Sequence, residues 1–274
     1  MDKPQTGTMM TRVISVSAAG VLPAFVIYPK MRSDLAPLVV LHGISRNASL
    51  LSELFLPEAE CSGRVIIVPH FEAGPWPDFQ RPGQPARPDL ALLALLTQID
   101  VGRPARPVRI DLFGHSGGAQ LAHRFAMLYP NLVGRLHLAA AGWYCLPDGS
   151  MPYPYGLGPP ERPQDMVWVR RHNAMLSRYL MLTVRVYVGD RDLGREDSLR
   201  KNELLDRTQG ANRYARAEHY VTSFRQAATM QSIMPDITLT TLLGITHDVA
   251  SAITRAGLAR LAVDAGDEML PSPC

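Results

Sequence analysis

The sequence predicts an α/β fold, in which a mostly parallel sheet of about eight strands is covered by helices on both faces. Short β-branched and apolar runs alternate with segments of helical periodicity from the third run onward. The first two runs have no helix between them, which indicates an antiparallel start to the sheet. With 274 residues, 46% apolar and 19% charged, the chain is long and apolar enough for one such domain over residues 1–274.

The strand and helix predictions follow from residue type and period. The expected strands are Val13–Val16, Ala24–Tyr28, Leu38–Leu41, Val65–Val68, Val108–Phe113, Leu136–Ala140, Val184–Val188 and Ile237–Leu242. The expected helices are Leu50–Glu60, Leu90–Ile99, Ala119–Leu128, Met166–Leu180, Tyr214–Met230 and Val249–Val263. Because ligands in open α/β sheets bind beyond the carboxyl ends of the strands, we expect the functional residues in the loops that leave those ends.

A long insertion at residues 145–181 interrupts this alternation. Residues 145–161 are rich in Pro, Gly and Tyr, and a helix is expected at Met166–Leu180. Long loops in compact domains often carry function. We therefore expect residues 145–181 to form a small cap over the strand ends.

Composition and charge exclude several classes of partner. The net charge is only +3, and no block of Lys and Arg follows the spacing of a phosphate backbone, so a nucleic-acid partner is not expected. Cys61, Cys145 and Cys274 lack the spacing of a zinc or redox site and are too few for a disulfide framework. No run approaches 18 apolar residues, and no signal-peptide pattern opens the chain. We expect a cytoplasmic protein with no membrane partner.

The strongest functional signal is a G-x-S-x-G pattern at residues 114–118, between an apolar strand and an Ala-rich helix. A serine at such a sharp turn needs glycine two residues before and two after it, as at Gly114 and Gly118. The turn would expose the Ser116 hydroxyl as a nucleophile, and the N–H of Gly117, at the start of the helix, would face a developing oxyanion. The alternative is a glycine-rich turn with a structural serine, but the strand and helix on either side favour the nucleophile.

A serine nucleophile needs a neutral imidazole to accept its proton. Of the eight histidines, His247 follows the last expected strand and precedes the last expected helix. The other seven lie within expected helices or strands, within the sharp turn at residues 114–118 (the nucleophile elbow), or directly after earlier strands. We therefore expect His247 to be the general base.

Four motifs in this order resemble the α/β-hydrolase superfamily across roughly residues 13–265. They are H-G at residues 42–43, G-H-S-G-G at 114–118, G-D-R-D at 189–192 and G-x-x-H at 244–247. The resemblance implies a serine hydrolase that cleaves a small carboxylic ester through an acyl-enzyme, without a cofactor or metal. Residues 207–213 are also similar, more loosely, to the esterase branch that includes polyhydroxybutyrate depolymerases. Thioesterases, peptidases, acyltransferases and non-catalytic binding modules use the same fold.

The resemblance also implies the remaining site residues. The residue after H-G, Ile44, would supply the second oxyanion N–H beside that of Gly117. Asp192 matches the superfamily's G-x-x-D pattern and would hold His247, although Asp190 remains open as the acid and Asp148 is a remote third candidate.

Several aromatic residues are candidates to line a substrate pocket, with ordinary packing as the alternative. They are Trp76, Trp143, Tyr144, Tyr153 and Tyr155.

Overall fold

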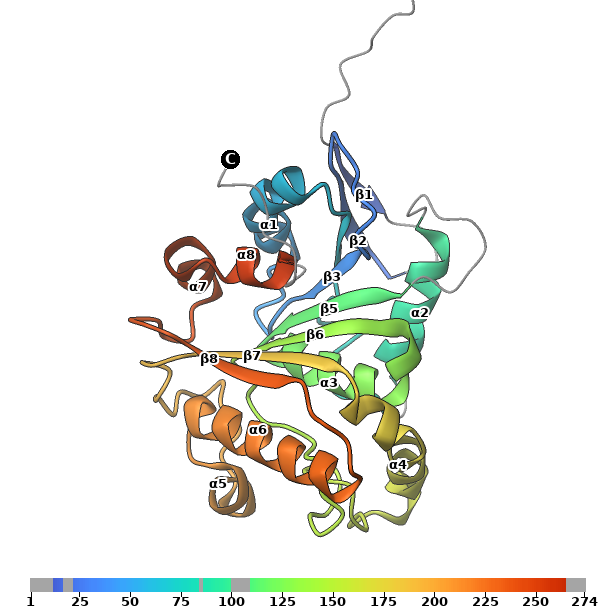
Figure 1. Ribbon diagram of the computed structural model, residues 1–274, viewed down its shortest axis with the longest axis vertical. Helices are drawn as coiled ribbons and strands as arrows, with labels where there is room; N and C mark the ends of the chain where they lie inside the picture. Colours follow the sequence, from blue (N-terminus) through green and yellow to red (C-terminus); the bar gives the residue numbers. More distant parts are fainter. Residues whose placement is uncertain (1–11, 17–21, 84–85, 100–108, 265–274) are drawn as a thin grey trace, which may run out of the picture.

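A single eight-stranded sheet forms the centre of the molecule (Figure 1). The computed structural model describes residues 12–16, 22–83, 86–99 and 109–264. The strands are β1 (Arg12–Val16), β2 (Ala24–Tyr28), β3 (Leu38–Leu41), β4 (Ile66–Pro69), β5 (Ile110–His115), β6 (Val133–Ala139), β7 (Thr183–Gly189) and β8 (Ile237–Leu242). Their order across the sheet is β1-β2-β4-β3-β5-β6-β7-β8.

Strand direction divides the sheet into two parts. The strand β2 pairs antiparallel with both β1 and β4, whereas the six strands from β4 to β8 run parallel. The predicted fold class is therefore confirmed, including the antiparallel start. Val108, expected to open the fifth strand, lies outside the described residues.

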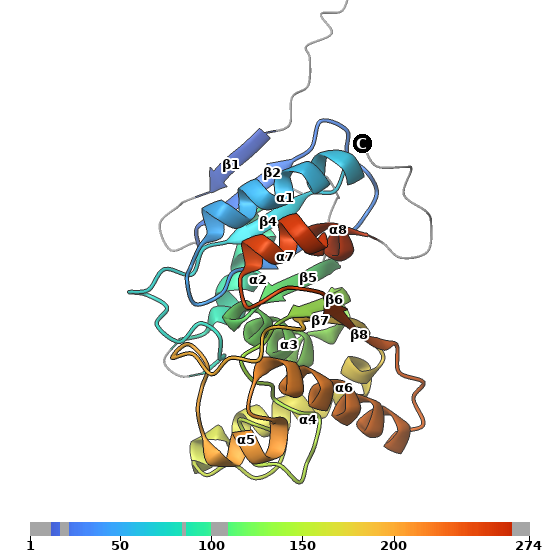
Figure 2. The ribbon, with the colours of Figure 1, turned by 90° about the vertical axis from the view of Figure 1, so that its left-hand side faces the viewer.

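Helices cover both faces of the sheet. They are α1 (Ala48–Ser62), α2 (Pro88–Gln98), α3 (Gly117–Leu128), α4 (Met166–Leu180), α5 (Glu203–Gln209), α6 (Arg213–Met230), α7 (Val249–Ala256) and α8 (Leu258–Val263), with 3-10 turns at Pro130–Leu132 and Pro163–Asp165. One core layer lies under α1, α7 and α8, which face the viewer in Figure 2. The other lies under α2, α3, α4 and α6. Each layer buries one face of the sheet, so a functional site that is open to substrate must lie at the ends of the strands.

Two helices near the carboxyl-terminal half differ from the predicted pattern. The helix expected at Val249–Val263 is divided at Gly257, whose φ of 67° is left-handed and ends α7 before α8 begins. The seven-residue helix α5 was not predicted, because so short a segment shows little periodicity. The side chain of Asn202 caps α5 by accepting the N–H of Leu205.

The segment expected to form a cap, residues 145–181, contributes to the main core. Its helix α4 packs against α3 and α6. Trp168 and Tyr179 of α4 are buried in the same apolar cluster as Tyr153 and Leu157 of the preceding loop. The proposal that this segment acts as a cap remains a prediction.

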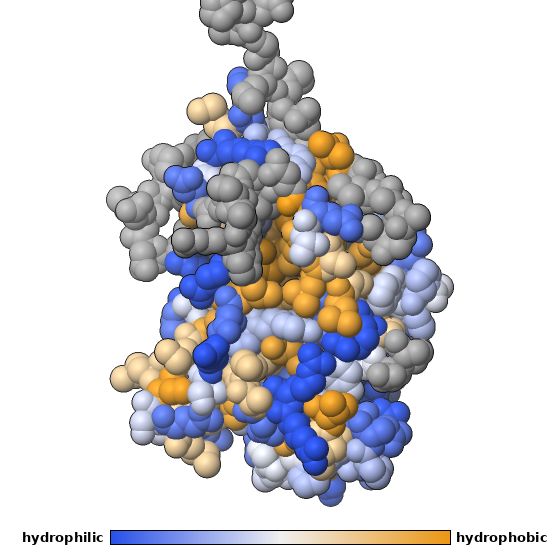
Figure 3. All heavy atoms as spheres, turned by 90° about the vertical axis from the view of Figure 1, so that its right-hand side faces the viewer, coloured by the Kyte–Doolittle hydropathy of each residue, from blue (hydrophilic) through white to orange (hydrophobic). Residues whose placement is uncertain are grey.

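The surface carries a mixture of polar and apolar side chains. Figure 3 views the side on which α2 and α4 lie and shows apolar side chains near the middle of that face. In the part of the chain that the structure describes, no helix is long and apolar enough to cross a membrane. Cys61 is exposed and Cys145 buried, whereas Cys274 lies outside the described residues.

Candidate active site

A strained turn between β5 and α3 carries Ser116. This residue has φ 54° and ψ −114°, a left-handed backbone that non-glycine residues rarely adopt. A Cβ atom on Gly114 would lie 2.4 Å from the main chain of Gly118, and one on Gly118 would lie 2.2 Å from the carbonyl oxygen of Leu41. Both glycines are therefore required by close backbone contact, as the G-x-S-x-G pattern predicted.

Three separate loops bring Ser116, His247 and Asp192 into one hydrogen-bonded chain. The Nε2 atom of His247 lies 3.0 Å from the Oγ atom of Ser116, and its Nδ1 atom lies 2.9 Å from Oδ2 of Asp192. These loops follow β5, β7 and β8, whose carboxyl ends meet at one edge of the sheet. Since the carboxylate accepts the Nδ1–H, Nε2 is left to accept the serine proton.

The other acidic candidates have different partners. Asp190 accepts the N–H of Gly244 at 2.7 Å and so ties the turn after β7 to the turn after β8. Asp148 accepts a hydrogen bond from the N–H of Ser150 at 2.8 Å, within its own loop. Of the three aspartates considered from the sequence, only Asp192 contacts His247.

Ile44 and Gly117 lie next to each other beside Ser116. A Cβ atom on Gly117 would lie 3.4 Å from the main-chain nitrogen of Ile44, and one on Gly43 would lie 3.3 Å from the Ser116 Cβ atom. No hydrogen bond among the described residues uses the N–H of Ile44 or of Gly117. The N–H groups of Ile44 and Gly117 thus have no partner among the described residues and lie close to Ser116.

His42 orders the loop that carries Ile44. Its Nδ1–H donates to the carbonyl of Gly43 at 2.8 Å, and its Nε2 accepts the N–H of Phe71 at 3.0 Å. Burial lowers the pKa of His42 to about 4, so the ring is neutral near pH 7 and can accept that second bond. Arg46, in the same loop as Ile44, also binds the segment after β4, because it donates a hydrogen bond to the carbonyl of Trp76 at 2.9 Å.

His115, directly before the serine, stacks on the candidate base. The His115 and His247 rings lie 4.9 Å apart with an angle of 28° between their planes. Burial, together with the nearby charges of His247 and Arg213, lowers the pKa of His115 well below its ordinary range. A neutral ring therefore packs against His247 and restricts its orientation without adding a second positive charge.

The five aromatic pocket candidates separate into different surroundings. Trp143 and Tyr155 pack edge to face, with ring centroids 4.9 Å apart. Tyr144 stacks on Tyr220 in the core, Tyr153 contacts His172, and Trp76 packs on Phe71. Only Trp143 and Tyr155 contact each other, and their role in a pocket remains a prediction.

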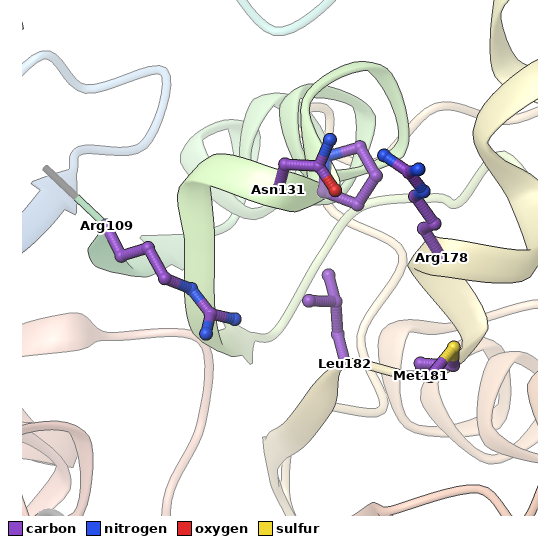
Figure 4. Close-up of a pocket in the computed structure, with 6 residues that line it drawn as sticks. Arg109, Asn131, Arg178, Met181 and Leu182 are labelled. Atoms are coloured by element: carbon purple, nitrogen blue, oxygen red, sulfur yellow. The ribbon is translucent and has the colours of Figure 1, made fainter. Parts of the chain in front are cut away.

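A pocket of about 450 Å³ lies at the opposite edge of the sheet (Figure 4). Its lining comes from the residues directly before β5, β6 and β7. These residues are Arg109, Pro130, Asn131, Arg178, Met181 and Leu182. Because Ser116 follows the carboxyl end of β5, this pocket at the amino ends is separate from the candidate site.

Comparison with solved structures identifies the fold. A poly(3-hydroxybutyrate) depolymerase from Bordetella parapertussis is 26% identical, with 88% of each chain covered and a TM-score of 0.69. The poly(aspartic acid) hydrolase-1 from Sphingomonas sp. KT-1 is 21% identical over 93% of this chain and 97% of its own, with a TM-score of 0.72. The chain has the α/β-hydrolase fold. An S-formylglutathione hydrolase from Agrobacterium tumefaciens, 16% identical, also superimposes over 95% of this chain and 94% of its own, with a TM-score of 0.54.

The superfamily resemblance drawn from the four motifs is confirmed by these structures. No family model matches the sequence, and no curated protein matches it. The α/β-hydrolase fold by itself does not determine a substrate.

Within this α/β-hydrolase fold, Arg213 is a site residue that the motifs did not assign. Its buried guanidinium lies 3.2 Å from Oδ1 of Asp192, the oxygen that His247 does not use. It also contacts Glu196 at 3.2 Å and the hydroxyl of Ser198 at 2.9 Å. The one sequence signal was its position at the end of the 207–213 segment, which resembled the depolymerase-like branch.

Proposed function

We propose that this protein is a serine hydrolase that cleaves a carboxylic ester through a covalent acyl-enzyme. The observation that supports it most strongly is the continuous hydrogen-bonded chain from Asp192 through His247 to Ser116. The strained backbone of Ser116 and the adjacent N–H groups of Ile44 and Gly117 complete the groups that acyl transfer needs.

The first half-reaction acylates the serine. His247 Nε2 takes the proton of Ser116 as Oγ attacks the ester carbonyl carbon, and the carbonyl electron pair moves to its oxygen. The N–H groups of Ile44 and Gly117 bind that oxyanion, and one such donor is typically worth about 10²–10³ in turnover. When the oxyanion collapses, the ester C–O bond breaks and His247 protonates the departing alkoxide.

The second half-reaction releases the acid. His247 takes a proton from water, whose oxygen attacks the acyl carbon, and it then returns the proton to Oγ of Ser116 as the acyl group leaves. Asp192 holds the Nδ1–H throughout and stabilises the imidazolium that forms twice in each cycle. The chain's own side chains and main-chain N–H groups thus suffice for every step.

Hydrolysis of 4-nitrophenyl esters of increasing chain length, together with labelling by a fluorophosphonate, tests the proposal. The wild-type protein should hydrolyse at least one ester and label at Ser116. Ser116→Ala should lower kcat by about 10⁴-fold or more and abolish labelling, since no other group supplies the nucleophile.

A matched pair of histidine variants shows whether a loss of labelling is specific to the candidate base. His247→Ala should lose labelling, whereas His219→Ala, at an exposed position on α6, should keep it. Hydrolysis of peptide or thioester substrates with none of the esters would redirect the assignment to those classes. No labelling and no hydrolysis in a folded wild-type protein would indicate a binding module instead.

The cytoplasmic location and the absence of nucleic-acid and membrane partners remain predictions from the sequence. The similar structures include ester hydrolases and a polyester depolymerase. The depolymerase is the basis for including oligomeric esters among the substrates to be tested.

A further inference from the structure

Four arginines in the described part of the chain are fully buried, and one of them differs from the rest. Arg64 pairs with Asp111, and the other two pair with carboxylates of their own, Asp192 for Arg213 and Asp206 for Arg216. Arg124 forms no ion pair with any described residue. A buried charge without a counter-ion is destabilising, so its retention calls for a physical reason.

The surroundings of Arg124 satisfy only part of its guanidinium. Its Nη1 donates to the carbonyl of Gln120 at 2.9 Å, and the guanidinium carbon lies 4.2 Å from the centre of the Trp143 ring. Its Nε and Nη2 atoms are buried and have no hydrogen-bond partner among the described residues. These two nitrogens form one edge of the guanidinium, the edge that binds both oxygens of a carboxylate in parallel.

Among the described residues, no neighbour of Arg124 supplies a negative charge near pH 7. Burial lowers the pKa of Arg124 only to about 10, so it stays charged. Two titratable groups that act on Arg124 are the Cys145 thiol, whose pKa burial raises to about 11, and the Tyr153 hydroxyl, whose pKa burial also raises. Both groups are therefore neutral when Arg124 is positive.

Arg124 lies on the helix that begins at the nucleophile. Ser116, Gln120 and Arg124 are four residues apart along α3 and so share one side of the helix, over a rise of about 12 Å. The loop that carries Trp143 follows β6, whose last residue, Ala139, accepts the N–H of Ser116 at 2.8 Å. Arg124 and Trp143 thus both belong to segments that contact the nucleophile elbow.

A second arginine lies over the same aromatic pair. The guanidinium carbon of Arg200 is 5.6 Å from the centre of the Trp143 ring and 5.7 Å from that of Tyr155. Arg200 is exposed and pairs with no carboxylate among the described residues. It belongs to the loop after β7, the same loop that supplies Asp192, so it also lies toward the carboxyl ends of the strands.

We propose that Arg124, Arg200 and Trp143 form an anion subsite beside Ser116 that binds a carboxylate group carried by the ester substrate. The inference rests on the proposed esterase function and names its substrate class, an ester whose acyl part ends in a carboxylate. Arg200 attracts the anion at the surface, and the free edge of Arg124 binds both of its oxygens. Because Trp143 is 3% exposed and Arg124 is fully buried, the Trp143 ring must move as the carboxylate enters.

A matched pair of esters tests the subsite. Mono-4-nitrophenyl glutarate carries a terminal carboxylate, and 4-nitrophenyl butyrate is a neutral ester of similar length. The wild-type protein should show a kcat/KM at least tenfold higher for the glutarate ester. Arg124→Met and Arg200→Gln should each remove most of that preference while leaving butyrate hydrolysis within about twofold of wild type.

Controls distinguish a subsite from a packing role. Arg178→Gln, an exposed arginine of α4 at the opposite edge of the sheet, should keep the full preference. Arg124→Lys keeps the positive charge but lacks the edge of two nitrogens, so it should keep only part of the preference for the glutarate ester. Equal losses on both esters in Arg124→Met and Arg200→Gln, or no preference in the wild type, would overturn the subsite.

A binding measurement tests the subsite independently of hydrolysis. Glutarate titrated into the Ser116→Ala variant should give a saturable change in tryptophan fluorescence as the Trp143 ring moves. The Ser116→Ala, Arg200→Gln double variant should give a much weaker one. No change in Ser116→Ala would reject the subsite. If neither ester is hydrolysed but glutarate still binds, the proposed function fails while the subsite stands.

Discussion

Replacement of Arg213 by methionine tests whether the buried ion pair supports the orientation of the candidate acid. Arg213 and Asp192 both have side chains with 0% exposure, and the guanidinium lies 3.2 Å from Oδ1 of Asp192. The same guanidinium also lies 3.2 Å from Glu196, but that side chain is 58% exposed. Loss of the arginine therefore leaves the buried carboxylate of Asp192 without a counter-ion, whereas water can solvate the carboxylate of Glu196.

The size of the effect follows from this burial. Removing one partner of a buried pair typically costs about 3–5 kcal/mol, and because only one carboxylate is left unpaired we expect the lower end. About 3 kcal/mol corresponds to a Tm lower by roughly 6–12 °C for a domain of this size. A misplacement of about 1 Å at a catalytic group can cost about 10²-fold, so we expect kcat to fall by about that factor with KM little changed.

The assay measures thermal unfolding and hydrolysis of a neutral 4-nitrophenyl ester for the same preparations. Arg64→Met is the matched control, because Arg64 is as buried and pairs with Asp111, which is not part of the candidate triad. It should lose stability and keep kcat. Arg213→Lys should recover part of the lost activity. An Arg213→Met variant with wild-type kcat, measured below its Tm, would refute the positioning role.

Three further predictions concern other parts of the molecule. Burial lowers the pKa of His172 from 6.5 to about 4, so the unfolded chain binds more protons than the folded one as the pH falls below 6.5, and the stability should fall. At pH 5 this residue should lower the free energy of unfolding, measured in urea, by about 2 kcal/mol. His172→Asn should remove that part of the pH dependence. Gly118→Ala should prevent folding or destabilise by several kcal/mol, because its Cβ would meet a main-chain oxygen at 2.2 Å, whereas Gly149→Ala, which meets nothing within 4 Å, should melt like the wild type. Asp190→Ala should cost about 1 kcal/mol in unfolding free energy and keep kcat, whereas Asp192→Asn should lower kcat by up to about 10⁴-fold.

Local patterns were sufficient for much of the fold. The period of the apolar residues located every strand of the sheet, because alternation and helical spacing depend only on neighbours along the chain. The G-x-S-x-G pattern is also recognised from adjacent residues, although only the contact at Gly114 is local, because a Cβ atom on Gly118 would meet the carbonyl oxygen of Leu41 in β3. The short helix α5 and the break at Gly257 were missed, because a seven-residue helix or one left-handed residue leaves little periodic signal.

The choice between two aspartates required the tertiary structure. Asp190 and Asp192 are two residues apart and chemically identical, so the G-x-x-D pattern favoured Asp192 but left Asp190 open. The Gly244 N–H engages Asp190, and His247 reaches Asp192 from another loop.

The sequence by itself determined the order of strands and helices and the position of the sharp turn at Ser116, because the apolar periods and the G-x-S-x-G pattern involve residues close along the chain. Only the tertiary structure decided that Arg213 lies behind Asp192 and that no carboxylate of a described residue pairs with Arg124. Whether a buried charge is paired depends on which distant segments the packing of the sheet brings beside it. The spacing of residues along the chain does not show which segments these are.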